Sequence, residues 1–150
     1  MGIMEELLVY AILFCEGIIV TEDLYQKRLD ELFLKNLDDE MLLDLEWETD
    51  IKKAVTYIKT HVNYQDINRE AFGMALMEKL KEYYDNCADI EEFAGAMYGL
   101  WESLPGNIQK EEPFWTLSYA DDPLSWGDEK QTRLIYEKML NYYKENTNLK

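Results

Sequence analysis

The sequence predicts an all-α fold: a single-domain helical bundle of six or seven helices with a long Pro/Trp-rich packed crossover near residues 100–126. Apolar residues recur three and four positions apart through most of the chain, which is the spacing of helices that bury one face. No stretch of any length alternates apolar and polar residues as a half-buried strand does. All three prolines lie within the crossover, at Pro105, Pro113 and Pro123, and proline prevents one long helix from running through it.

The first third of the chain predicts two helices joined by a short connection. Met4 to Cys15 is apolar on nearly every face, so this helix belongs in the centre of the fold and ends at Gly17. Cys15 itself is interpreted as a small core hydrophobe. Thr21 is a good N-cap for the second helix, which runs to about Asn36. The predicted buried stripe of the second helix is Tyr25, Leu29, Leu32 and Phe33.

The rest of the chain predicts four or five more helices. A short one lies within residues 38–50, with Met41, Leu42 and Leu45 available to anchor one face. The predicted starts of the others are, in order, Thr49 or Asp50, Asp66 or Asn68, Asp89, and Asp128 with Glu129. Gly95 and Gly99 predict close packing of their helix against a neighbour, and Leu134 is assigned to the core face of the last helix.

The crossover carries more apolar area than a solvated loop needs, so we expect it to fold back and pack as part of the core. Trp115 and Trp126 are therefore expected to be largely buried. On that expectation, Trp115→Ala costs about 3–5 kcal/mol of stability. The large apolar residues of the crossover are Trp101, Phe114, Trp115, Leu117, Tyr119, Leu124 and Trp126.

The charge is the unusual feature of the composition. The 150 residues, enough for one domain, include 31 acids and 15 bases, for a net charge of −16. Most of the excess lies in residues 1–50, which hold 14 acids and three bases. Such a surface argues against nucleic acid and anionic membranes as partners, because binding phosphate needs a basic surface. It favours either a basic protein partner or colloidal stability alone.

Location follows from what the N-terminal sequence lacks. The longest apolar run, Leu7 to Cys15, is too short to span a bilayer. Glu5 and Glu6 precede it where a signal peptide would carry bases, and no small-residue cleavage site follows. With only two cysteines, Cys15 and Cys87, the chain is no disulfide scaffold, and we expect reduced thiols in the cytoplasm.

No catalytic residue, metal site or cofactor is predicted. A single histidine, His61, and two distant cysteines cannot build an ordinary zinc site, and His61 is assigned to a capping or surface role. No phosphate-binding or dinucleotide-binding glycine motif is present. Carboxylates four apart, Glu40 with Asp44 and Glu78 with Glu82, leave open a Mg²⁺-dependent hydrolase as the weakest alternative.

The acidic segment, Asp38–Asp50, is the candidate binding site. It holds seven acids and no base in thirteen residues, with Trp47 among them. One interpretation is a docking patch for a basic surface, with Trp47 as an aromatic anchor. The other is a solvated acidic face with a half-buried Trp47. The candidate partner-binding residues are Asp38, Asp39, Glu40, Asp44, Glu46, Trp47, Glu48 and Asp50.

The C-terminal stretch PFWTLSYADDPLSWGDEKQTRLIYEKMLNYY, about a fifth of the chain, resembles the ends of small bacterial families associated with toxin immunity. In its small size, acidity and few cysteines the chain also resembles immunity proteins of contact-dependent growth inhibition and related polymorphic toxin systems. The resemblance implies tight, stoichiometric neutralisation of a cognate toxin, often a basic nuclease. It assigns no residue.

Three functions are therefore carried forward. The leading one is an immunity or inhibitor protein that binds and neutralises a basic cognate toxin domain through an acidic surface. The second is a general protein-interaction adaptor whose partner need not be toxic. The third is the Mg²⁺-dependent carboxylate hydrolase.

Overall fold

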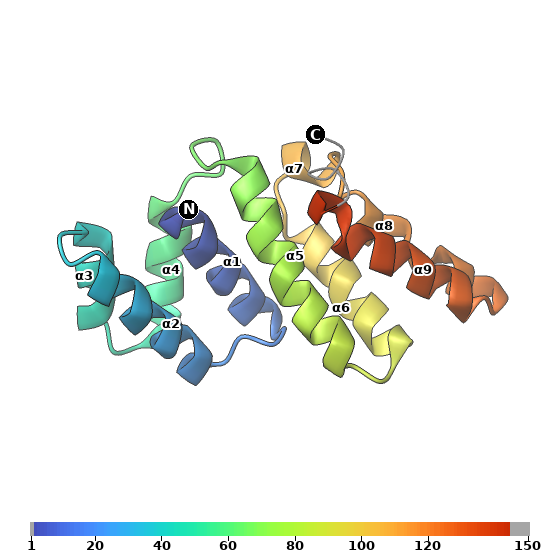
Figure 1. The fold of residues 1–150 in the computed structure, drawn as a ribbon, viewed down its shortest axis with the longest axis horizontal. Coiled ribbons are helices and arrows are strands. Elements are labelled where there is room, and N and C mark those ends of the chain that lie inside the picture. The colour runs from blue at the N-terminus through green and yellow to red at the C-terminus, as the bar shows by residue number, and fades with distance from the viewer. Residues whose placement is uncertain (1, 145–150) are drawn as a thin grey trace. The chain divides into compact units, whose positions relative to one another are not determined.

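The computed structural model describes residues 2–144. The sequence also predicts that the chain frays from Asn146 to Lys150, and these residues lie outside the described range. Within the described residues every regular element is a helix, so the all-α prediction is confirmed. Ten helices have bounds in this range, more than the six or seven predicted, because residues 106–126 form three short helices. In chain order they are α1 (Ile3–Glu16), α2 (Glu22–Lys35), α3 (Glu40–Trp47), α4 (Ile51–His61), α5 (Arg69–Asn86), α6 (Ile90–Glu102), α7 (Gly106–Gln109), α8 (Thr116–Tyr119), the 3₁₀ helix η1 (Asp122–Trp126) and α9 (Glu129–Leu140), as Figure 1 shows.

The chain divides into two compact units, Met1–Phe72 and Gly73–Lys150, with the boundary inside α5. Unit 1 holds α1 to α4 and the first turn of α5. Unit 2 holds the rest of α5 and all later elements. That the two units form one domain stays a prediction.

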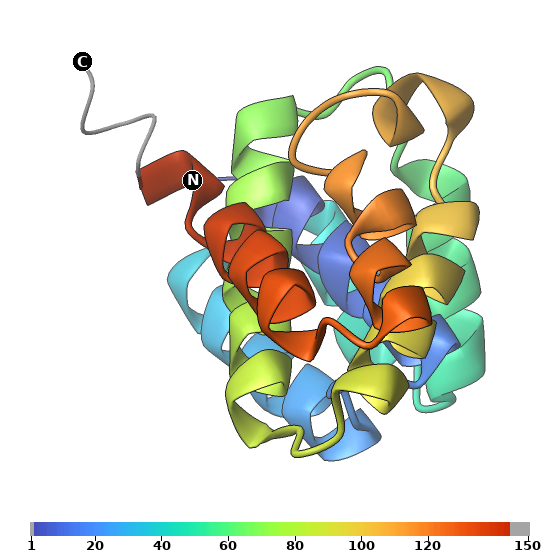
Figure 2. The same ribbon diagram turned by 90° about the vertical axis from the view of Figure 1, so that its right-hand side faces the viewer.

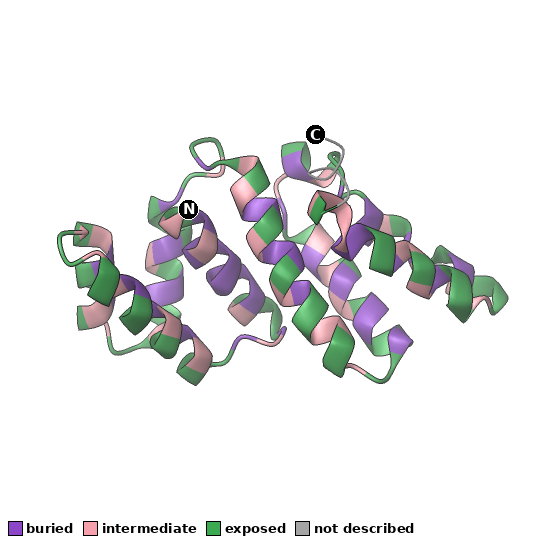
Figure 3. Ribbon diagram, in the orientation of Figure 1, coloured by how far each residue is buried: buried purple, intermediate pink, exposed green. Residues whose placement is uncertain are grey.

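In unit 1, α1 is the central helix, as its composition predicts. Its residues from Leu7 to Leu13 are all buried, it packs on α4 and α2, and buried positions cover most of it in Figure 3. Gly17 ends α1 in the left-handed conformation, with φ 69°, which glycine adopts without strain. The assignment of Cys15 to the core is wrong. Cys15 is exposed because it lies in the last turn of α1, after the buried run has ended.

Side-chain caps fix where most of the longer helices begin. The Thr21 hydroxyl accepts a hydrogen bond from Leu24 N at 3.2 Å, which confirms the predicted start of α2. Of the alternatives left open by the sequence, Asp50 caps α4 and Asn68 caps α5. Asp89 and Asp128 cap α6 and α9. Each cap satisfies a backbone N–H that has no partner inside its helix.

In unit 2, an aromatic cluster forms the core around Phe93. The Phe93 ring lies 5.4 Å from Tyr83, 5.1 Å from Tyr84 and 4.9 Å from Tyr136, measured between ring centroids. These contacts join α5, α6 and α9. Helix α9 also packs on α8 and η1, which lie beside it in Figure 2.

The crossover buries residues other than its tryptophans. Trp115 is 43% exposed and Trp126 is 67% exposed, so the prediction that both are largely buried is wrong. The stability loss predicted for Trp115→Ala depended on that burial and no longer follows. Trp115 directly precedes the single turn of α8, whose core side is formed by Thr116 and Leu117, and the buried Phe114 comes just before Trp115. Trp126 ends η1, where Gly127 turns the chain. The buried residues of the crossover are Leu100, Leu104, Ile108, Pro113, Phe114, Thr116, Leu117, Ala120 and Pro123.

Two further packing predictions are also wrong. A Cβ added to Gly95 would meet no atom of a neighbouring element within 4 Å, so the prediction of close packing at Gly95 is wrong, while close packing at Gly99 stays a prediction. Leu134 is exposed because the buried side of α9 is formed by Thr132, Tyr136 and Met139. Gly73, in contrast, is buried in α5 where the hydroxyl of Tyr143 occupies the position of a Cβ.

Candidate interaction surface on α3

Local sequence explains why the acidic segment forms a short helix. The Asp39 carboxylate accepts a hydrogen bond from Leu42 N at 3.0 Å and so caps α3. Leu42 and Leu45 are buried, and α3 packs on α2. The helix ends at Glu48, where the backbone becomes extended.

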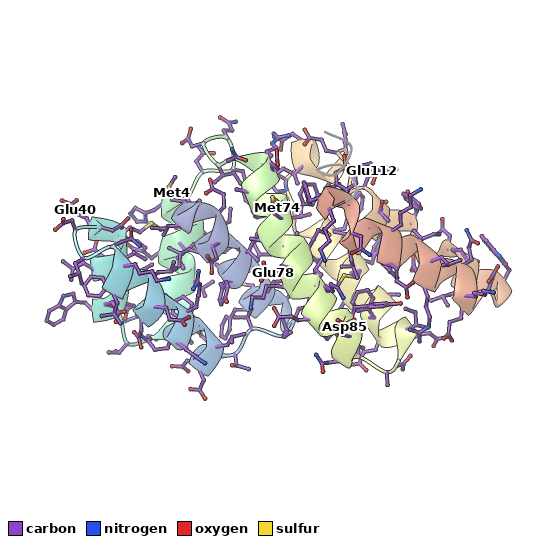
Figure 4. All side chains as sticks on the ribbon, in the orientation of Figure 1. Met4, Glu40, Met74, Glu78, Asp85 and Glu112 are labelled. Carbon is purple, nitrogen blue, oxygen red and sulfur yellow. The ribbon has the colours of Figure 1, made fainter. Side chains whose placement is uncertain are left out.

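The solvent side of α3 combines two carboxylates with two large apolar side chains. Glu40, Leu43, Asp44 and Trp47 are all exposed, and their spacing of three and four residues places them on one side of the helix. We call these four residues the α3 face. Leu43 is 41% exposed and Trp47 is 80% exposed, so the expectation of a half-buried Trp47 is wrong. The Glu40 side chain, at the start of α3, projects away from the ribbon in Figure 4.

Asp44 is held in place by α4. The hydroxyl of Tyr57 donates a hydrogen bond of 2.9 Å to Asp44 Oδ2. Burial, followed by this hydrogen bond, raises the pKa of the Tyr57 hydroxyl above its usual 10.0. The Tyr57 ring stacks on His61 at 4.0 Å, and His61 Nδ1 lies 2.9 Å from Tyr57 O. His61 thus supports Tyr57 at the end of α4, which agrees with its assigned surface role.

The other acids of the segment divide into two kinds. Asp39 and Asp50 are caps, and Glu48 Oε2 accepts a hydrogen bond from Asp50 N at 3.2 Å. The side chains of Asp38 and Glu40 take part in no hydrogen bond or ion pair with the described residues. The structure therefore brings Glu40, Asp44 and Trp47 together on one face, while Asp39, Glu48 and Asp50 serve the local fold.

Glu46 lies outside the α3 face and interacts with Asp30 of α2. Burial, then a hydrogen bond and repulsion from the Asp30 carboxyl, raise the pKa of Glu46 to about 7. Its Oε1 atom is buried, and no donor among the described residues faces it. The neighbouring Tyr25 hydroxyl is also buried without a partner in the described residues, and burial followed by the charges of Glu46 and Glu48 raises its pKa to about 12. Glu46 is thus a partly exposed group whose carboxylate takes part in the α2–α3 contact.

Two residues of this site, Leu43 and Tyr57, are not among the binding residues predicted from the sequence. Leu43 could have been found, since it follows Glu40 by three residues and precedes Trp47 by four. Tyr57 could not, because only the packing of α4 beside α3 brings its hydroxyl to Asp44.

The carboxylate pairs considered for Mg²⁺, Glu40 with Asp44 and Glu78 with Glu82, have no third metal ligand beside them in the described residues. Within residues 2–144, no group of three or more histidine, cysteine, aspartate or glutamate side chains is arranged to hold a metal ion. Glu82 instead forms an ion pair with Lys79 at 3.0 Å, and its partner in the proposed pair, Glu78, is exposed on α5 (Figure 4).

No described helix combines the length and the apolar character needed to cross a membrane. No protein-family model, curated protein or solved structure matches the chain.

Proposed function

We propose that this protein is an immunity or inhibitor protein that binds a basic domain of a cognate toxin through the acidic segment, with the α3 face at the centre of the contact. The α3 face is the observation that carries the proposal. It exposes Leu43 and Trp47 beside the carboxylates of Glu40 and Asp44. Large exposed apolar groups rimmed by charge are typical of protein-binding surfaces.

The exposed tryptophan favours docking over a merely solvated helix. A helix that only has to stay in solution places polar residues on its outer side, because exposed apolar area gains nothing from water. Here Trp47, four residues from Leu43, presents an indole that a partner could desolvate. Tryptophan is enriched among the residues that dominate binding energy at interfaces.

Charge supplies the expected chemistry of the partner. With Asp38 and Glu40 unpaired among the described residues and Asp44 oriented by Tyr57, the segment presents negative charge that Lys and Arg side chains would neutralise. Complementary charge mainly accelerates association, while a central aromatic residue mainly slows dissociation. The proposal places this binding in the cytoplasm and includes no nucleic acid or membrane as partner.

The test is the kinetics of binding to the product of the adjacent gene, measured by surface plasmon resonance at two salt concentrations. Trp47→Ala should speed dissociation, and Glu40→Lys/Asp44→Lys should slow association and flatten its salt dependence. Trp126→Ala and Glu78→Lys are matched controls, since both alter exposed residues of unit 2 and should leave the kinetics unchanged. Tight binding that none of the α3 variants changes would show that the docking surface lies elsewhere.

A growth assay distinguishes an immunity protein from an adaptor, since both would bind their partner through the α3 face. Expression of the adjacent gene product alone should stop growth, and co-expression of this protein should restore it. Trp47→Ala should weaken the rescue. A partner that binds through the α3 face but is harmless on its own would favour the adaptor.

A further inference from the structure

A second surface, in unit 2, gathers four aromatic side chains that are partly exposed. Ring centroids of Tyr98 and Trp101 on α6 lie 5.8 Å apart, and Trp101 lies 5.9 Å from Trp115 in an edge-to-face contact. Tyr119 follows Trp115 by one helical turn, and its hydroxyl is 3.4 Å from Thr116 Oγ1. We call Tyr98, Trp101, Trp115 and Tyr119 the aromatic surface.

Packing beneath these rings holds them in place. Helices α6 and α8 are in contact, and Met97, Leu100 and Leu117 turn inward as the core side of the same two helices. This arrangement leaves the aromatic side chains on the solvent side. The aromatic surface is therefore preorganised, which lowers the entropy lost on binding.

The polar edge of Trp101 is already used within the fold. Trp101 Nε1 donates to Gln109 O at 3.2 Å, and Gln109 Nε2 donates back to Trp101 O at 2.8 Å. Trp101 can therefore offer a ligand its ring but no hydrogen-bond donor. That favours a ligand that stacks on the Trp101 ring over a ligand that needs a hydrogen bond from the Trp101 N–H group.

Carboxylates border the rings. Glu102 is exposed on α6 one turn after Tyr98, and Glu112 Oε2 accepts a hydrogen bond of 2.6 Å from Thr116 Oγ1, the atom beside the Tyr119 hydroxyl. Residues 98–122 hold five acids and one base, Lys110. Aromatic faces bordered by carboxylates suit a cation and repel an anion.

We propose that the aromatic surface binds an extended, arginine-bearing segment of a partner protein. The guanidinium group is planar, so it can stack on the indole and phenol rings while its N–H groups pair with a carboxylate such as Glu102. Lysine offers a point charge without that plane and should bind more weakly. This proposal goes beyond the α3 face and does not depend on it.

The four tryptophans make the test specific to each surface. In ¹⁵N-labelled protein the indole N–H signals report Trp47 on the α3 face, Trp101 and Trp115 on the aromatic surface, and Trp126 elsewhere on unit 2. The probe is a synthetic peptide of alternating arginine and glycine. It should shift the Trp101 and Trp115 signals saturably and leave Trp126 unchanged. The lysine–glycine peptide should bind more weakly, and the glutamate–glycine peptide should have no effect.

Two variants separate stacking from charge. Tyr98→Ala/Trp115→Ala, checked for folding by circular dichroism, should weaken binding of the arginine peptide by about tenfold. Glu102→Gln/Glu112→Gln keeps every ring, so it should weaken binding of both the arginine and the lysine peptide while the preference for arginine, which comes from stacking, remains. Trp126→Ala is the matched control for the loss of an exposed indole.

Several results would overturn the proposal. One is a peptide that shifts only Trp47, which would locate basic segments on the α3 face alone. Another is an equal shift of all four signals that salt abolishes, which would reveal general attraction to an acidic protein. Broadening of the Trp115 signal with protein concentration and no peptide would identify a second copy of the chain as the occupant.

Discussion

At the scale of single residues, Glu5 links two distant parts of unit 1. This side chain of α1 is only 5% exposed, and its Oε2 atom accepts a hydrogen bond of 2.8 Å from Asn68 N, at the residue that caps α5. A hydrogen bond to a charged carboxylate contributes about 1.5–3 kcal/mol to stability. Glu5 therefore joins the first helix to the start of the fifth.

Glu5→Ala should lower the free energy of unfolding by about 1–3 kcal/mol, because the part-buried hydrogen bond from Asn68 N to the Glu5 carboxylate is lost. Urea denaturation followed by circular dichroism is the measurement. Glu5→Gln keeps an acceptor oxygen and should lose less, and Glu16→Ala, exposed on the same helix, should change little. Equal stability of Glu5→Ala and the parent would mean that this contact contributes nothing.

Glu46 gives unit 1 a dependence on pH. Its pKa of about 7 in the folded protein exceeds its usual 4.5, so the folded state holds a proton that the unfolded chain releases between these values. Stability from this group is therefore fully present below about pH 4.5 and is lost as pH rises to about 7.

Glu46→Gln carries no charge at that position at any pH. This variant should therefore be more stable than the parent at pH 8, and the difference in stability should be smallest at pH 5. Asp30→Asn should act in the same direction, since repulsion needs both carboxylates. Urea midpoints of parent and variants across this range provide the comparison. A difference between Glu46→Gln and the parent that stays constant with pH would contradict the assignment.

At the scale of the elements, capping and apolar spacing account for what the sequence predicts well. Thr21, Asp89 and Asp128 begin their helices as predicted, because a side-chain oxygen before an apolar-periodic run has a local physical effect. The short helices of residues 106–126 could not be predicted in this way. Each has five residues or fewer, too short for a periodic pattern to show which side faces the core.

The tryptophans show the same limit at the candidate sites. Apolar area alone suggested that Trp115 is buried, whereas only the packing of α8 on α6 determines which side of α8 is covered. Trp47 was recognised as a candidate because acids surround it. Its exposure and its alignment with Leu43 required the structure. The pairing of Asp44 with Tyr57 depends on contact between helices that are separate in sequence.

Gly95 offers a prediction about α6. It is exposed in the middle of that helix, and an added Cβ would meet no atom of another element within 4 Å. Gly95→Ala should therefore raise the free energy of unfolding by about 1 kcal/mol, since alanine loses less backbone entropy in a helix. The matched control is Gly73→Ala on α5, where the new Cβ would displace the Tyr143 hydroxyl and cancel that gain. A gain of equal size in both variants would show that Tyr143 does not lie against α5 in solution.

At the scale of the whole molecule, a net charge of −16 opposes folding, because the compact state brings like charges closer together. Ion pairs among the described residues offset part of this repulsion. Arg133 with Glu129 and Lys81 with Asp85 are exposed pairs within single helices, which contribute little. Arg28 of α2 and Glu6 of α1 form a stronger pair with two hydrogen bonds, which raise the pKa of the Arg28 guanidinium.

Adding NaCl from about 10 mM to about 1 M shortens the range of electrostatic interactions from about 30 Å to about 3 Å. We expect the free energy of unfolding to rise over this range, because screening weakens the repulsion among many acids more than it weakens a few ion pairs. Urea denaturation at several salt concentrations measures the effect. Asp38→Asn/Glu40→Gln removes two charges without removing a hydrogen bond to the described residues, so this variant should be more stable at low salt and respond less to NaCl. If NaCl instead lowers the stability of the parent, ion pairs such as Arg28–Glu6 outweigh the repulsion. In that case the acidic residues do not destabilise the folded protein, and a basic partner would not stabilise it by reducing repulsion.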